Sequence, residues 1–295
     1  MNPKDKEKIL QAGKIASEVK KYARTIVKKG VPLLEIAEKI EAKIEQLGGK
    51  PAFPVNLSIN DIAAHYTPNH DDKTIASGLL KVDFGVHVDG WVADTAFSID
   101  LENNEENKRL ILASELALEI ASKTIKLGVT NSRIGKEIEE SISSGEISPI
   151  INLSGHQIKQ YELHSGLTIP NINNNQEIPI KEGLYAIEPF TTNGSGKVYD
   201  GKNSGIYELH SEKSPRSQTA REVLNFIIKE YNTLPFCSRW LYKKLGAKSL
   251  IGLKQLEENG NLHHFPMLME ANRGKVAQSE NTFLVEKDKV IVTSE

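Results

Sequence analysis

The chain has 295 residues, of which 39% are hydrophobic and 26% charged, and its formal net charge is −2. This balance is typical of a soluble globular protein and excludes the strongly basic surface of many nucleic-acid-binding proteins. A single cysteine excludes an internal disulfide, and the sequence shows neither a signal peptide nor the roughly eighteen apolar residues of a membrane span. We therefore expect a cytoplasmic protein that contacts neither nucleic acid nor membrane directly.

Helical patterns occupy four stretches in the first half of the chain. Apolar residues recur at helical spacing over residues 3–29 and 32–46, and a glycine closes each stretch. The same spacing predicts helices over residues 107–127 and 131–144. These helices are amphipathic, so each should cover a sheet with its apolar side.

Residues 79–99 predict a β-hairpin, because two runs of alternating residues meet at Asp89-Gly90, a strong signal for a type I′ turn. Alternation places an apolar set on one face, and Asp83 and Asp94 lie diagonally on the other. The hairpin alone leaves open whether these acids are solvated or share a cation. The turn predicts the cross-strand pairs Val88–Trp91, Gly85–Asp94 and Asp83–Ala96.

The second half of the chain alternates short strands with one helical segment. Strand patterns begin at Pro149 and resume at Gly274, where a second hairpin forms around Lys287-Asp288. Residues 202–264 are mostly helical and show no obvious strand pair, so we interpret them as a helical insertion within one domain over residues 1–295. Acid-bearing hairpins at both ends indicate two similar halves around one sheet.

Four carboxylates and one imidazole occur in short strand patterns between apolar or small residues. Each alone has an ordinary explanation, such as a buried salt bridge for Glu188, a core histidine for His156 or an edge-strand acid for Glu280. Together they fit a pair of divalent ions, since two such ions balance four carboxylates, and oxygen-rich ligation favours Mn, Fe or Co over a closed structural zinc site. The five residues are Asp83, Asp94, His156, Glu188 and Glu280.

Motifs along the whole chain resemble type 2 methionine aminopeptidases in their short archaeal form. They are PAFPVNLSINDIAAHYTP, KVDFGVHVDGWVADTAF, NLSGHQI, YELHSG, YAIEPF, TLPFCSRW and AQSENT. The resemblance implies an α/β (α+β) pita-bread fold, a curved antiparallel sheet with pseudo-twofold symmetry, outer helices and a helical insertion. It also implies a dinuclear metalloexopeptidase that removes the initiator methionine when the second residue is small, by attack of a hydroxide bound to both metals.

The same resemblance implies a role for each of the five candidate ligands. Asp83 would chelate the first metal, and Asp94 and Glu280 would bridge both metals. His156 and Glu188 would bind the second metal, and Glu188 would also accept a proton from the metal-bound water. The family resemblance leaves the physiological metal open among Co, Mn, Fe and Zn.

Two histidines outside the ligand set, His65 in AAHYTP and His164 in YELHSG, resemble the family's catalytic and substrate-binding histidines. Such side chains could polarise the scissile carbonyl or stabilise its oxyanion. The alternative is that both are ordinary loop histidines without such a role. Phe53 and Phe190 resemble walls of the methionine pocket, although both could equally fill the core. Phe265 stands where the family often has tyrosine, and we expect it in the core.

The resemblance also defines partners, alternatives and one departure. It implies action on nascent polypeptide N-termini, with the ribosome as a further candidate partner, and we expect a monomer. The alternatives are a pita-bread binding protein without catalysis and an Xaa-Pro peptidase. Asn281 follows Glu280 where family members usually have histidine, and on an alternating strand it should point away from Glu280.

Overall fold

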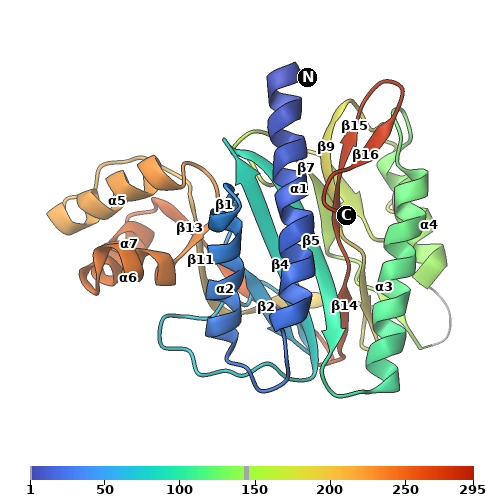
Figure 1. Cartoon of the computed structure of the whole chain (residues 1–295), viewed down its shortest axis with the longest axis horizontal. Coiled ribbons are helices and arrows are strands. Elements are labelled where there is room, and N and C mark those ends of the chain that lie inside the picture. The colour runs from blue at the N-terminus through green and yellow to red at the C-terminus, as the bar shows by residue number, and fades with distance from the viewer. Residues whose placement is uncertain (1, 143–145) are drawn as a thin grey trace.

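The computed structural model describes residues 2–142 and 146–295. Four helices lie over the strands of the main body, and three further helices form a separate cluster at one side (Figure 1). The first four helices are α1 (Pro3–Ile26), α2 (Leu33–Gln46), α3 (Glu105–Thr124) and α4 (Asn131–Ile142). The cluster consists of α5 (Gln218–Glu230), α6 (Ser238–Leu245) and α7 (Lys248–Glu258).

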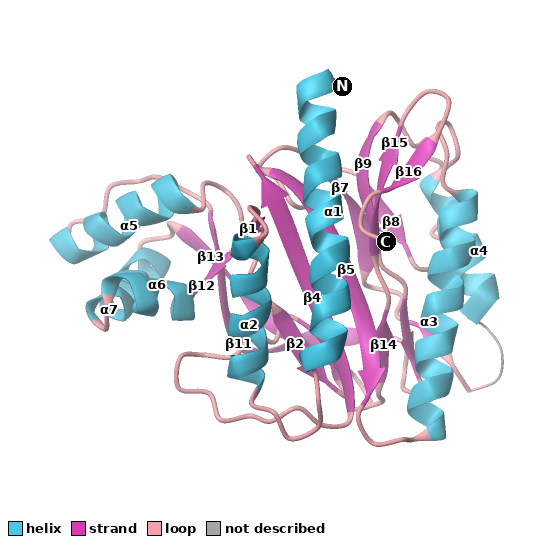
Figure 2. Ribbon diagram, in the orientation of Figure 1, coloured by secondary structure: helices cyan, strands magenta, loops and turns pink. Residues whose placement is uncertain are grey.

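The strands are mostly short and pair in four antiparallel groups (Figure 2). Those of the first half are β1 (Lys50–Pro51), β2 (Asn56–Ile59), β3 (Ile62–Ala64), β4 (Leu79–Val88), β5 (Trp91–Asp100), β6 (Ser148–Pro149), β7 (Ser154–Ile158) and β8 (Thr168–Pro170). Those of the second half are β9 (Gly183–Ile187), β10 (Phe190–Thr192), β11 (Val198–Leu209), β12 (Phe236–Cys237), β13 (Leu262–Glu270), β14 (Val276–Gln278), β15 (Asn281–Val285) and β16 (Val290–Val292).

All four helices predicted in the first half are present, with ends that differ by a few residues. Helix α3 begins earlier than expected because the Asn104 side chain caps it, accepting hydrogen bonds from the Glu106 and Asn107 amides. Helix α1 ends at Ile26, where Val27 adopts extended backbone and is buried. The last two residues predicted for α4, 143 and 144, lie outside the described residues.

The β4–β5 hairpin has the predicted register. Val88 pairs with Trp91, and the turn residues Asp89 and Gly90 have φ of 50° and 79°, as a type I′ turn requires. The further pairs Gly85–Asp94 and Asp83–Ala96 follow from this turn. A local turn thus fixes which hairpin residues share a face.

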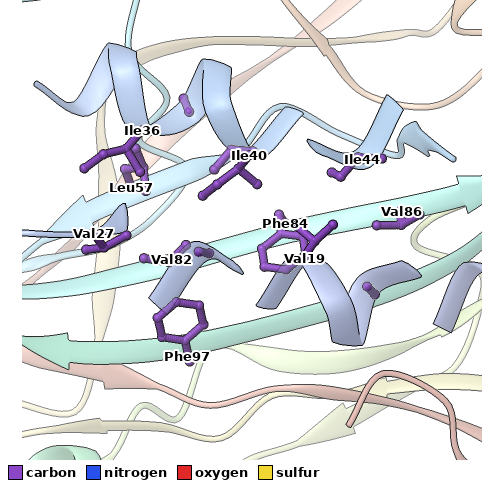
Figure 3. Packing of buried hydrophobic residues seen from close by; sticks show 14 of the residues in the cluster. Val19, Val27, Ile36, Ile40, Ile44, Leu57, Val82, Phe84, Val86 and Phe97 are labelled. Carbon is purple, nitrogen blue, oxygen red and sulfur yellow. The ribbon is translucent and has the colours of Figure 1, made fainter. Parts of the chain in front are cut away.

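The apolar face of the hairpin packs under α1 and α2. In Figure 3, Val82 and Phe84 of β4 and Phe97 of β5 point toward Val19 of α1 and Ile40 of α2. All five are buried, with exposures of 2% or less. The burial of this face leaves the other face of the hairpin, which carries the two aspartates, free to form a site.

The second half of the main body repeats the arrangement of helices over strands. Helices α3 and α4 cover the sheet of β16, β15, β9, β7 and β8, with a separate apolar core between them. A backbone bridge between Ala96 of β5 and Glu280, just before β15, joins the two halves. The amide of Glu280 donates to the Ala96 carbonyl at 3.0 Å.

The segment over residues 202–264 differs from the sequence interpretation, because it is not free of strand pairs. The long strand β11 pairs with β13 along most of its length, and helices occupy only the part from Gln218 to Glu258. Two register shifts interrupt the pairing, and Gly205 has φ of 81°. This irregular, glycine-containing strand reads as a turn in the sequence, which is why its pairing was missed.

Candidate metal centre

Five strand segments carry the predicted ligands to one face of the sheet. Asp83 lies on β4, Asp94 on β5 and His156 on β7, whereas Glu188 follows β9 and Glu280 precedes β15. The bridge that joins the halves sets this arrangement, because Ala96 pairs with Asp83 on one side and with Glu280 on the other. Neighbouring partners in antiparallel strands present their side chains on the same face.

The structure brings all five predicted ligands to one cavity of about 220 Å³. Single ligand atoms of Asp94, His156 and Glu280 lie within 4.8 Å of one another. The His156 Nε2 atom is 3.6 Å from Asp94 Oδ2 and 3.9 Å from Glu188 Oε1. Asp83 lines the same cavity beside this group.

The four carboxylates lie close together with little compensating charge. Burial raises the pKa of Asp83 to about 7. Burial and then the neighbouring acids raise the pKa values of Asp94, Glu188 and Glu280 well above the usual range. Within residues 2–142 and 146–295, no lysine or arginine forms an ion pair with any of them. Divalent cations would provide the missing positive charge.

Two further observations support a metal centre. The Oδ1 atoms of Asp83 and Asp94 are buried and have no hydrogen-bond partner in the described structure. Burial, followed by the nearby His164, lowers the pKa of His156 well below its usual value, so this imidazole is neutral at pH 7. A neutral imidazole has a free lone pair for a metal, and the residues present therefore fit divalent ions.

Gln278 belongs to the site, although the sequence interpretation did not include it. Its Nε2 atom donates to Glu188 Oε2 at 3.2 Å, and its backbone exchanges two hydrogen bonds of 2.8 Å with the Ser98 hydroxyl. The signal was its position two residues before Glu280, which puts both side chains on one strand face. A side-chain amide in a strand pattern does not by itself indicate a metal site, but it can orient a neighbouring carboxylate through a hydrogen bond.

His65 and His164 lie in the wall of the same cavity. The His164 ring is open to the cavity, yet the surrounding protein atoms desolvate it enough to lower its pKa to about 4. Burial also lowers the pKa of His65. The His65 Nδ1 atom is 3.1 Å from the Pro266 carbonyl, which can only accept, so Nδ1 carries the proton and Nε2 is left as an acceptor.

Aromatic side chains form an apolar part of the cavity wall. Phe53 and Phe190 both line it. Phe265 lines it too and stands edge-on to the His65 ring at 5.5 Å, so the expectation that it lies in the core is wrong. Its half-buried position depends on β13 pairing with β3 and β11, which the sequence did not reveal.

Asn281 lies on the far side of its strand from the cavity. Its Oδ1 atom accepts a hydrogen bond of 2.9 Å from Lys20 Nζ of α1, and contacts the Thr95 and Ser294 hydroxyls at 3.4 and 3.3 Å. Lys20 Nζ also lies 3.4 Å from the backbone carbonyl of Glu280. The residue that departs from the family pattern therefore supports the strand from behind.

Fold and site together define a metal-dependent hydrolase. The sequence matches metallopeptidase family M24 over residues 7–287. It is 45% identical to a methionine aminopeptidase of Pyrococcus abyssi, covering 99% of this chain and 100% of the relative. The chain therefore belongs to family M24 and, within it, to the methionine aminopeptidases, enzymes that remove an N-terminal methionine with the help of metal.

Solved structures show the same fold at low sequence identity. A methionine aminopeptidase of Thermotoga maritima has a TM-score of 0.72 and 20% identity, covering 100% of this chain and 98% of that one. The structure of a thermophilic Arx1 has a TM-score of 0.87 and 15% identity, covering 99% and 91%. The predicted pita-bread fold is confirmed. No helix in the described part of the chain is long and apolar enough to cross a membrane.

Proposed function

We propose that this enzyme cleaves methionine from polypeptide N-termini when the second residue is small, using two divalent ions. The observation that carries this proposal is the group of four carboxylates and one neutral imidazole in a cavity with an aromatic wall. Two ions of charge +2 would balance four carboxylates, which otherwise repel one another. The proposed ligands are Asp83, Asp94, His156, Glu188 and Glu280.

Metal ions in such a site act as Lewis acids and lower the pKa of water, so that a nucleophile is available at neutral pH. Cobalt, manganese, iron and zinc all suit this donor set. These five side chains would hold the ions, and the unpartnered Oδ1 atoms of Asp83 and Asp94 support a role as metal ligands.

Glu188 is the proposed proton acceptor. Its Oε2 atom receives the hydrogen bond from Gln278, which fixes the carboxylate plane, and its Oε1 atom faces His156. This carboxylate lies at the proposed metal centre, where it could accept a proton from the attacking water. The proton taken from water would then pass to the leaving amine.

The two histidines divide the recognition of the scissile peptide. His65 offers Nε2 as an acceptor, because its Nδ1 proton is bonded to Pro266, and so it would accept from the N–H of the scissile bond. The neutral His164 ring carries one N–H group, which could donate a hydrogen bond to the oxyanion. His65 would thus serve as the acceptor and His164 as the donor.

The methionine side chain would occupy the aromatic part of the cavity. Phe53, Phe190 and Phe265 supply apolar contact area, and the unbranched thioether fits a narrow apolar space. The preference for a small second residue is what the family resemblance implies.

The natural substrates would be nascent chains in the cytoplasm, and the ribosome is a candidate partner of a monomeric enzyme. We assign residues 1–295 to one catalytic domain, with the helical part as an insertion. The buried ion pair between Arg239 of α6 and Glu41 of α2 supports this assignment, since it fixes the insertion to the main body with nitrogen–oxygen distances of 2.7 and 2.8 Å.

The test is hydrolysis of a Met-Ala-Ser peptide by protein loaded separately with Mn, Co, Fe or Zn. Release of methionine, with slower release from a peptide whose second residue is large, supports the proposal. Absence of turnover with every metal overturns it and favours a binding protein without catalysis. Faster cleavage of an Xaa-Pro substrate than of Met-Ala-Ser would instead assign a proline-directed peptidase.

A further inference from the structure

Asn56 lies beside the candidate metal centre. It is the first residue of β2, and its partner on β4 is Asp83. Partners in antiparallel strands have Cα atoms about 4.5–5.5 Å apart and side chains on the same face. Asn56 lines the same cavity as Asp83 and is only 4% exposed.

The side-chain amide of Asn56 is satisfied on one side only. Its Nδ2 atom donates to the Pro54 carbonyl at 2.8 Å, which fixes the orientation of the amide. The Oδ1 atom is buried, and no donor among the described residues reaches it. Asn152, in the same cavity wall, differs because both of its amide atoms bond to the backbone of Val198.

A buried acceptor without a donor is rare in native proteins, and one beside the cavity can receive its donor from a bound molecule. The acids of the cavity are the proposed metal ligands, and the aromatic wall offers no oxygen. The free α-amino group of a polypeptide has a pKa of about 7.7–8.0, so at neutral pH it is mostly an ammonium with three N–H donors.

We infer that the Asn56 side-chain carbonyl accepts a hydrogen bond from the free α-amino group of the substrate. This inference rests on the proposed function, since it concerns the N-terminal methionine in the same cavity. Asn56 thereby helps to distinguish a chain terminus from an internal methionine, which lacks the ammonium.

The experiment compares L-methionine with 4-(methylthio)butanoate, which differs by lacking the amino group. Calorimetry on the manganese-loaded protein gives a dissociation constant for each ligand and hence their ratio. In Asn56→Leu we expect the preference for the amine-bearing ligand to fall about tenfold, as for the loss of one hydrogen bond to a charged group. Asn56→Asp keeps an acceptor oxygen and should keep the preference.

Asn171→Leu is the matched control. Asn171 is buried, donates to the Leu153 carbonyl at 3.1 Å and also has an unpartnered Oδ1, but it does not line the cavity. The inference is overturned by an unchanged preference in Asn56→Leu, by equal weakening of both ligands, by loss of the preference in Asn56→Asp, or by the same fall in Asn171→Leu. Failure of the wild type to cleave Met-Ala-Ser would overturn the proposed function separately.

Discussion

Glu270 and Glu280 lie on neighbouring segments of the chain and are both buried, yet their environments are opposite. Burial tends to raise the pKa of Glu270, but hydrogen bonds from Ser195, Gly274 and Asn272 lower it overall. Among the described residues Glu280 has no comparable set of donors, and burial with neighbouring acids raises its pKa. A buried carboxylate that accepts hydrogen bonds from the protein has a structural role. One without such donors is available to bind a cation.

The same contrast holds for Glu41. Arg239 donates two hydrogen bonds to its carboxylate, and the Trp240 indole donates a third at 2.9 Å. A bidentate arginine supplies both charge and geometry. The chain therefore neutralises its structural acids itself, which makes the unneutralised group around Glu280 more informative than burial alone.

The first prediction compares the loss of Glu280 with the loss of Glu270. In Glu280→Gln we expect kcat/KM for Met-Ala-Ser to fall roughly a thousandfold or more, because several kcal/mol of metal-dependent stabilisation is lost. In Glu270→Gln we expect the free energy of unfolding to fall by about 1–3 kcal/mol, because buried backbone donors lose a charged acceptor. Peptide assays, metal analysis and thermal unfolding of both variants provide the measurement.

The comparison fails if both variants lose metal to the same extent, or if Glu280→Gln unfolds the protein while Glu270→Gln leaves it intact. Metal content per folded molecule is the decisive quantity, since a drop in activity alone could come from partial unfolding. We expect Glu270→Gln to keep its full metal content.

The second prediction separates chemistry from metal binding within the site. Both Glu188→Gln and His164→Ala should lower kcat by about 10²–10⁴, the usual contribution of a positioned acid, base or oxyanion donor. Only Glu188→Gln should also weaken metal binding, since His164 is not a proposed ligand. Metal titration of the apo proteins tests this division, and loss of metal in His164→Ala would show that His164 is a ligand.

Local sequence signals predicted the part of the site that lies on the β4–β5 hairpin. The Asp89-Gly90 turn fixed the register that places Asp83 and Asp94 on one face, and simple alternation placed Asn281 away from Glu280. The short strand context of His156, Glu188 and Glu280 marked them as the remaining candidate ligands, and the motif resemblance implied their roles. Their assembly in one cavity depends on pairing between distant segments, which alternation does not specify.

Features that depend on non-local pairing were missed. The β11–β13 pair contains two register shifts, so its polar, glycine-containing segment resembles a loop in the sequence. The exposure of Phe265 to the cavity depends on that same strand pair. Because the pair was not predicted, Phe265 was expected in the core. Asn56 and Gln278 were missed for a different reason, because an uncharged amide in a strand gives no electrostatic signal until its neighbours are known.

The third prediction concerns the stability of the metal-free protein as pH changes. Acids with raised pKa values keep their protons longer in the folded than in the unfolded state, so stability falls as pH rises from about 4 through the folded pKa. The lowered pKa of His164 acts oppositely, but only up to the unfolded value near 6.5. Above pH 6.5 one buried lysine opposes the four acids, since burial lowers the pKa of Lys81 to about 7 and its contribution to stability rises with pH above that value. Four acids with raised pKa values, that of Asp83 being about 7, outweigh one lysine, so stability still falls.

Between pH 6.5 and 8 we expect the Tm of the metal-free protein to fall by roughly 5 °C, from about 2 kcal/mol of lost stability. Saturating Mn should remove this fall, since the metal favours ionised ligands and binds the folded state. Scanning calorimetry at several pH values gives the slope. Glu270→Gln should be less stable throughout but keep the same slope, and a Tm that rises over this range would contradict the assignment of the unsatisfied acids.

The fourth and smallest effect concerns support of the site from behind. Lys20 donates to Asn281 Oδ1 and lies against the Glu280 carbonyl, while burial lowers its pKa to about 8. It thus holds the backbone that carries a proposed bridging ligand, as the hydrogen-bonded surroundings of metal ligands do in other enzymes. In Lys20→Met we expect the metal affinity of the apo protein to fall about tenfold.

Lys6→Met provides the matched control for this last effect. Lys6 lies on the same helix and pairs with Glu286 at a solvent-accessible position, so its loss should change metal affinity by less than about twofold. Calorimetric metal titration of both variants, with thermal unfolding alongside, distinguishes support of Glu280 from general stabilisation of α1. Equal metal affinity in the two variants would show that Lys20 only fastens the helix. A selective loss in Lys20→Met would show that an unsatisfied carboxylate still needs a rigid backbone, because a bridging ligand displaced by a fraction of an ångström cannot contact two ions at once.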